Sequence, residues 1–249
     1  MTVFAEWTKL RSVRSTAWTL LTTIVLTVGI AGVVCTFTVA RPPAHPDALD
    51  PAGLSLTGVQ LAQLAVGVLG VLLITGEYAT GTIRATMTAV PRRLPVLWGK
   101  LIVAALTIVA VCGPAAFAAF LVGQQILAGK HLDTTISAPG VLRALVGSAL
   151  YLMLIGLLGL GLGTLLRSTA GAVSALFGVV FGLPVVVAFL PEHIAEHVLR
   201  YLPGQAGTVI LNAQPDPGSL GPWTGLALLV GYVAVALALG AWRLRRQDV

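Results

Sequence analysis

Six long runs of uncharged, mainly apolar residues alternate with shorter polar segments along this chain. The runs lack Asp, Glu, Lys, Arg and His, and each is 19 to 23 residues long. They cover residues 18–40, 57–75, 101–122, 144–166, 169–190 and 223–242. A helix rises about 1.5 Å per residue, so each run can cross a hydrocarbon core of roughly 30 Å. The pattern predicts an all-α integral membrane protein with six transmembrane helices, since lipid leaves backbone polar groups without water.

Two other interpretations of these runs fit the pattern poorly. A transmembrane β-barrel would show alternating segments of about ten residues, and the chain has none. The first run is longer than the apolar core of a cleaved signal peptide, which is about 7–15 residues. We therefore expect a single transmembrane domain over residues 1–249, in which the first run remains as a span.

The polar segments before the first span and after the second have a pattern of their own. Residues 2–15 place apolar side chains on one side of a helical wheel, which predicts an amphipathic helix lying along the membrane; a plain basic flank is the alternative.

The segment after the second span, residues 76–100, reads GEYATGTIRATMTAVPRRLPVLWGK. Gly76 and Gly81 border a turn-prone stretch, and a short helix ending near Met87 would be stopped by the prolines that follow. Such a helix, held between two spans, can act as a lever, although an inert basic loop fits equally well.

The segments on the other side of the membrane are less regular. Residues 41–56 are rich in proline, and we expect them to be irregular. Residues 191–222 are expected to form two short helices that do not cross the bilayer, the first with an apolar stripe of Ile194, Val198, Tyr201 and Leu202. The string His193 to His197 matches the H-x-x-E-H pattern of some zinc peptidases. A zinc site needs a third ligand, and the only acidic residues downstream are Asp216 and, across the membrane, Asp248, so a solvated helix face is the favoured interpretation.

Charge fixes the expected orientation. The chain is 57% hydrophobic and 10% charged, with a net charge of +6. If both termini are cytoplasmic, eleven Lys and Arg lie inside and four lie outside, as the positive-inside rule prefers. The excess of positive charge is therefore explained by topology, and no nucleic-acid partner is expected.

The sequence lacks the groups that would power transport alone. It has no phosphate-binding loop for ATP and no ionisable residue inside a span, as coupled carriers commonly have. We expect no enzyme activity and no cofactor in this chain, and energy supplied by a partner. Two small-residue pairs, Gly159 with Gly163 and Gly178 with Gly182, allow close helix approach, either within one chain or between two.

Three motifs carry a resemblance to a known family. EWTKLRS spans Glu6 to Ser12, GEYATGTIR spans Gly76 to Arg84 and is followed by AVPRR, and LLRSTAGA spans Leu165 to Ala172. With six spans, these motifs resemble the permease subunit of type-two ATP-binding-cassette (ABC) exporters, in a form common in actinobacteria. The resemblance covers essentially the whole chain, and the second motif is the most specific.

The resemblance implies partners and roles. A separate ABC ATPase subunit would bind the chain, and a second permease subunit, identical or different, would complete a dimer in a bacterial cytoplasmic membrane. The cargo would be a drug, lipid or similar amphiphile; a non-transport assembly or regulatory subunit is the alternative. The residues implied in coupling to the ATPase are Glu77, Tyr78, Gly81, Thr82, Arg84, Pro91 and Arg92. Of these, Pro91 and Arg92 would shape the entry into the third span together with Lys100. The residues implied in the connecting helix are Glu6, Trp7, Lys9 and Arg11.

Overall fold

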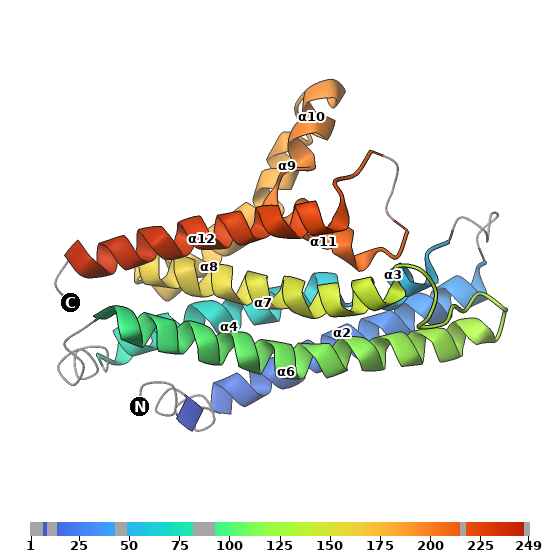
Figure 1. The fold of residues 1–249 in the computed structure, drawn as a ribbon, viewed down its shortest axis with the longest axis horizontal. Helices are drawn as coiled ribbons and strands as arrows, with labels where there is room; N and C mark the ends of the chain where they lie inside the picture. The colour runs from blue at the N-terminus through green and yellow to red at the C-terminus, as the bar shows by residue number, and fades with distance from the viewer. Residues whose placement is uncertain (1–6, 9–13, 43–48, 82–92, 215–217, 247–249) are drawn as a thin grey trace.

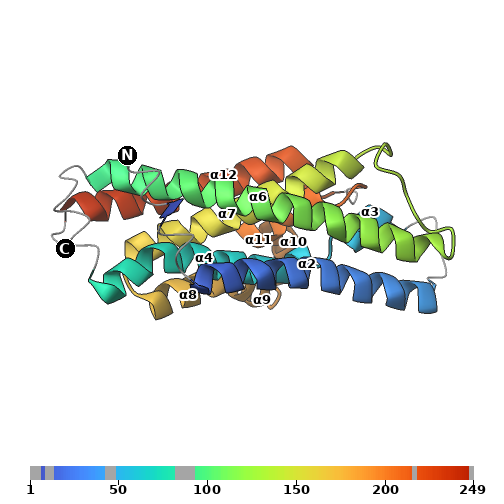
Figure 2. The ribbon, with the colours of Figure 1, turned by 90° about the horizontal axis from the view of Figure 1, so that it is seen from below.

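The chain folds as a bundle of long, roughly parallel helices, seen in Figure 1 and, after a 90° turn, in Figure 2. The computed structural model describes residues 7–8, 14–42, 49–81, 93–214 and 218–246, and within these residues it is helical with no strand. The long helices are α2 (Arg14–Ala40), α4 (Val59–Thr80), α6 (Arg93–Ala128), α7 (Val141–Leu166) and α12 (Pro222–Arg246). The fifth span is built from α8 (Thr169–Phe177), the π-helix η2 (Gly178–Gly182) and α9 (Leu183–Val187). The six predicted spans are thereby confirmed as six helices long and apolar enough to cross a membrane.

Several boundaries differ from the sequence prediction. Helix α4 continues through Gly76 and ends only at Gly81, which takes the left-handed conformation at φ 71°. The expected turn at Gly76 is therefore wrong, because one glycine inside a helix costs only about 1 kcal/mol and does not end it. Helix α6 begins before the predicted span and reaches Ala128. It passes through Pro114, which neighbouring helices allow in a membrane bundle.

The proline-rich segment 41–56 is not wholly irregular. Helix α3 (Pro51–Ser55) begins after Asp50, whose carboxylate accepts hydrogen bonds from the N–H groups of Ala52 and Gly53. An aspartate followed by proline at the first helical position is a favoured helix start. The local chemistry thus overrides the helix-breaking effect of proline elsewhere in the segment.

Helix α7 forms the centre of the bundle. In its most apolar stretch 72% of the residues are buried, the highest share among the six spans. Glycines bring it close to α4: a Cβ on Gly159 would collide with the carbonyl of Gly67, and one on Gly70 with the carbonyl of Gly156. Such contacts are typical of membrane helices, which gain stability from close packing because lipid is as apolar as leucine.

Polar side chains within the spans are satisfied internally. In α2, Thr19, Thr23 and Thr27 each donate to the carbonyl four residues earlier. Between α4 and α7, the Tyr151 hydroxyl donates to the Gln63 side-chain oxygen, and both side chains are buried. The threonine bonds stay within α2, whereas the Tyr151–Gln63 bond joins α4 to α7, the interhelical role favoured from the sequence for these two residues.

The segment after the fifth span contains two short helices, α10 (Glu192–Leu199) and α11 (Pro203–Thr208), and the 3₁₀-helix η3 (Val209–Leu211). Helices α9 and α10 protrude from the side of the bundle (Figure 1). The apolar stripe expected for α10 is only partly used: Leu202 packs with Ala195 and Val187, whereas Ile194, Val198 and Tyr201 are exposed.

The ends of the bundle differ in charge. Helix α2 begins and α12 ends at one end, on the left in both figures, and we call this the basic end because Arg14, Lys100, Arg167 and Arg243 lie there. Helix α3 and the connection between α6 and α7 lie at the opposite end.

Candidate functional site at the basic end of the bundle

A buried ion pair joins the ends of two helices at the basic end. The ammonium group of Lys100, near the start of α6, lies 2.7 Å from the carboxylate of Glu77, near the end of α4. The Lys100 side chain is 4% exposed and that of Glu77 is 12% exposed. At this burial, removing one partner leaves an uncompensated charge and costs about 3–5 kcal/mol. The pair therefore fixes the two helix ends to each other.

The position of this pair follows from the length of α4. Glu77 lies beyond the charge-free run, and it is helical because α4 continues to Thr80. This extra helix brings the carboxylate level with the start of α6. Lys100 is the last charged residue before the third charge-free run, so its long side chain can reach toward the membrane boundary.

A second set of contacts ties α4 to α7 and α12. The guanidinium carbon of Arg167 lies 5.6 Å from the centre of the Tyr78 ring, within the range of a cation–π interaction. Arg167 ends α7 in the left-handed conformation, at φ 56°. Its side chain donates to the carbonyl of Arg243 on α12 at 3.5 Å, and Arg243 donates in return to the carbonyl of Leu165. The turn between α7 and α8 is thus bound to α4 through Tyr78 and to α12 through Arg243.

These residues form one cluster at the end of α4 and the start of α6. We call Glu77, Tyr78, Lys100, Arg167 and Arg243 the basic-end cluster. It links four helices at the place where the chain leaves α4 and enters α6. A force applied to that connection would reach α4 and α6 as a pair, and it would reach α7 and α12 through Tyr78 and Arg167.

Comparison with known proteins gives the family of this fold. A model of the ABC-2 family transporter proteins matches residues 7–249. The chain belongs to the ABC-2 transporter family. A search of curated proteins found no match. As an ABC-2 protein, the chain is a membrane permease subunit of an ABC transporter, in agreement with its six apolar helices.

The structure of this ABC-2 permease places some of the predicted coupling residues. Glu77 and Tyr78 lie in the basic-end cluster, and Gly81 ends α4. Thr82, Arg84, Pro91, Arg92 and the expected coupling helix lie outside the described residues. Trp7 is helical and exposed, whereas Glu6, Lys9, Arg11 and most of the expected connecting helix also lie outside them.

Sequence reasoning did not identify the roles of Arg167 and Arg243 in this cluster. Arg167 is one of two non-glycine residues with positive φ in the described chain. Its motif, LLRSTAGA, contributed to the family resemblance, and Ser168 caps α8 through the N–H of Gly171. The predicted fourth and fifth spans are separated by only two residues, and Arg167 is the charged one of the two. This position is the sequence signal that points to Arg167.

The zinc-peptidase string lies far from this cluster, on α10. His193, Glu196 and His197 are all exposed. Arg200 lies 3.2 Å from the Nδ1 atom of His197, where a cation would disfavour a bound metal. Within the residues that the structure describes, no three His, Cys, Asp or Glu side chains gather as metal ligands.

Proposed function

We propose that this chain is the permease subunit of an ABC exporter in a bacterial cytoplasmic membrane, driven by a separate ABC ATPase. The proposal places the basic end in the cytoplasm, since Lys and Arg favour that side. Its cargo would be a small amphiphile, such as a drug or a lipid-like molecule. The single observation that supports it best is the buried Glu77–Lys100 pair, which joins the end of α4 to the start of α6.

This geometry suits coupling because the ion pair makes two spans respond together. A short cytoplasmic connection that moved α4 alone would deform the bundle locally. With α4 and α6 joined by a 2.7 Å ion pair, a push from an ATPase on the connection is shared by both spans. Helix α4 packs along the central α7 through glycines, so the movement would be passed to the middle of the bundle.

A second permease subunit is part of the proposal, and the fifth span favours a place for it. The space beside Gly159 and Gly163 is occupied by residues of α4 in the same chain. On the fifth span, by contrast, a Cβ on Gly178 would meet no atom of the described residues within 4 Å. Small residues with open space around them allow another helix to approach closely. We propose that a second subunit, of this chain or a related one, approaches here.

Co-expression with an ABC ATPase encoded beside this chain tests the proposal. We expect the two proteins to purify together from mild detergent in a fixed ratio. We also expect ATP hydrolysis by the complex to change when Arg84→Ala is introduced, while the permease still inserts. Purification of the permease without any ATPase would favour the alternative, a non-transport assembly or regulatory subunit.

A further inference from the structure

The opposite end of the bundle is filled by a short segment made largely of small residues. Helix α11 and η3, residues 203–211, lie against α7, α12 and the fifth span, and we call them the plug. A Cβ on Gly207 would press on the ring of Tyr151, and one on Gly204 would lie 2.9 Å from the carbonyl of Val180. Ile210 fills the space beside Gly147. The plug therefore packs directly against the ring of Tyr151, whose hydroxyl donates to Gln63.

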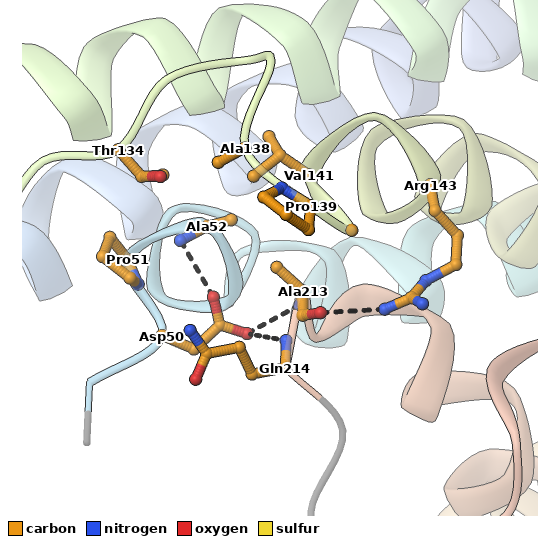
Figure 3. A pocket seen from close by; sticks show the side chains of 11 residues that line it. Asp50, Pro51, Ala52, Thr134, Ala138, Pro139, Val141, Arg143, Ala213 and Gln214 are labelled. Carbon is orange, nitrogen blue, oxygen red and sulfur yellow. Dashed lines mark hydrogen bonds between the residues drawn. The ribbon is translucent and has the colours of Figure 1, made fainter. Parts of the chain in front are cut away.

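Two charged side chains hold the end of the plug by its backbone (Figure 3). One carboxylate oxygen of Asp50 accepts hydrogen bonds from the N–H groups of Ala213 and Gln214, at 2.7 and 3.3 Å. Arg143, on α7, donates to the carbonyls of Asn212 and Ala213, at 2.9 and 3.0 Å. Both N–H groups and carbonyls of residues 212–214 are thus hydrogen-bonded, by side chains that lie far away in the sequence.

The two oxygens of Asp50 have separate tasks. The first accepts from Ala52 and Gly53 and so begins α3. Among the residues that the structure describes, the second accepts from the N–H groups of Ala213 and Gln214, just after the plug. One carboxylate therefore joins the first outer connection to the last one, and a substitution can remove the second task while it preserves the first.

The hydrogen bonds from Asp50 and Arg143 lie beside a cavity. A cavity of about 470 Å³ is bordered by Asp50, Arg143, Thr134, Pro139 and Gln214 (Figure 3). Both charged residues are only half-buried, so water can replace the bonds that they make. A hydrogen-bonded contact with water next to it can open and close, unlike the packed contacts between α4 and α7.

We infer that Asp50 and Arg143 form a latch that keeps the plug closed, and that the plug moves away from α7 when the latch opens. The inference rests on the proposed function, in which cargo leaves at this end of the bundle. Asp50 and Arg143 are then positioning residues: they bind the backbone of residues 212–214, which directly follow the plug, and they set how often it opens.

The test uses the full chain in lipid nanodiscs with Ile210→Cys as a reporter. Ile210 is fully buried in the plug, and the native Cys35 and Cys112 are also buried. A charged, membrane-impermeant maleimide is added, and mass spectrometry measures labelling at each cysteine.

The latch variants are made in this reporter chain. Asp50→Asn keeps an oxygen for the start of α3, where asparagine caps as well as aspartate, but it turns the other oxygen into a donor. Arg143→Gln weakens the other side of the latch. Asp133→Asn, which removes an exposed charge on the neighbouring connection, is the matched control.

We expect Asp50→Asn and Arg143→Gln each to raise the labelling rate of the reporter cysteine about tenfold, and Arg143→Lys to have a smaller effect. Cys112 should stay protected, and Asp133→Asn should behave like the parent. Labelling of the reporter at the parent rate in both variants would overturn the latch. Equal gains at Cys112 would also overturn it, because they would show loosening of the whole bundle.

A second arm separates this inference from the proposed function. In a complex with the ATPase, ATP should raise labelling of the reporter cysteine in the chain with an intact latch. If no ATPase binds, the proposed function fails, and the nucleotide-free comparison still decides whether Asp50 and Arg143 hold the plug. If the ATPase binds and hydrolyses ATP without any gain at the reporter, the role of the latch in transport is overturned.

Discussion

At the scale of single residues, this permease uses charge sparingly and places it at helix ends. Glu77 and Lys100 illustrate what sequence can and cannot predict. Their location beyond the charge-free runs, and the family resemblance, indicated a coupling role for the segment around Glu77. The ion pair itself could not be predicted, because it depends on α4 extending to Thr80 and on the alignment of two side chains 23 residues apart. Asp50 shows a missed signal, since aspartate before proline indicates a helix start.

Replacing only one partner of the Glu77–Lys100 pair should destabilise the permease more than expected from the effect of replacing both. We expect Glu77→Gln or Lys100→Met alone to lower the free energy of unfolding by about 3–5 kcal/mol, because each leaves one buried charge without its partner. The double variant should lose less than the sum of the two. Unfolding in mixed micelles, arranged as a double-mutant cycle, gives the coupling energy.

The exposed Lys130→Met is the control for that cycle, and it should change stability by less than about 0.5 kcal/mol. Strictly additive losses for Glu77→Gln and Lys100→Met would contradict a direct interaction between the two side chains.

At the scale of elements, hydrophobic runs predicted the spans well because a charge inside a membrane helix is expensive. They predicted boundaries less well. The predicted runs follow the apolar cores of the spans, whereas a helix continues until its backbone is capped, as α4 does at Gly81. The π-helix within the fifth span was also beyond prediction. Its residues, Gly178–Gly182, are apolar or small like their neighbours. The segment differs from them only in its backbone hydrogen bonds, which span five residues where those of an α-helix span four.

The two small-residue pairs should respond differently to the same substitution. Gly159→Leu would drive a side chain into the carbonyl of Gly67, so we expect a loss of at least about 1–3 kcal/mol and poor recovery of folded protein. Gly178→Leu faces open space, so the single chain should stay folded while its association with a second permease subunit weakens. Thermal stability and the mass of the purified complex measure the two effects.

Gly231→Leu on α12 is the matched control, because a Cβ at Gly231 also meets no atom within 4 Å. An unchanged complex with Gly178→Leu would contradict the proposed place of the second subunit. A loss of complex with Gly231→Leu as well would show that any added bulk on the lipid face has this effect.

At the scale of the whole molecule, the bundle has two ends that are built differently. The basic end is held by a buried ion pair and by arginine contacts to Tyr78 and to backbone carbonyls. The opposite end is closed by the plug and by hydrogen bonds beside a cavity. This difference suits a transporter in which force enters rigidly at one end and a closure opens at the other. Composition predicted the charge asymmetry, but which residues grip one another is a property of the folded chain.

In the proposed mechanism, an ABC ATPase acts on this permease through the connection between α4 and α6. Photo-crosslinking from single positions in the co-expressed complex tests it most directly. A photoreactive residue replaces Arg84 in that connection or, as the control, exposed Asp133 at the opposite end of the bundle. We predict an adduct with the ATPase from position 84 and none from position 133. An intact complex that gives no adduct from position 84, or that gives one from position 133, would contradict the account.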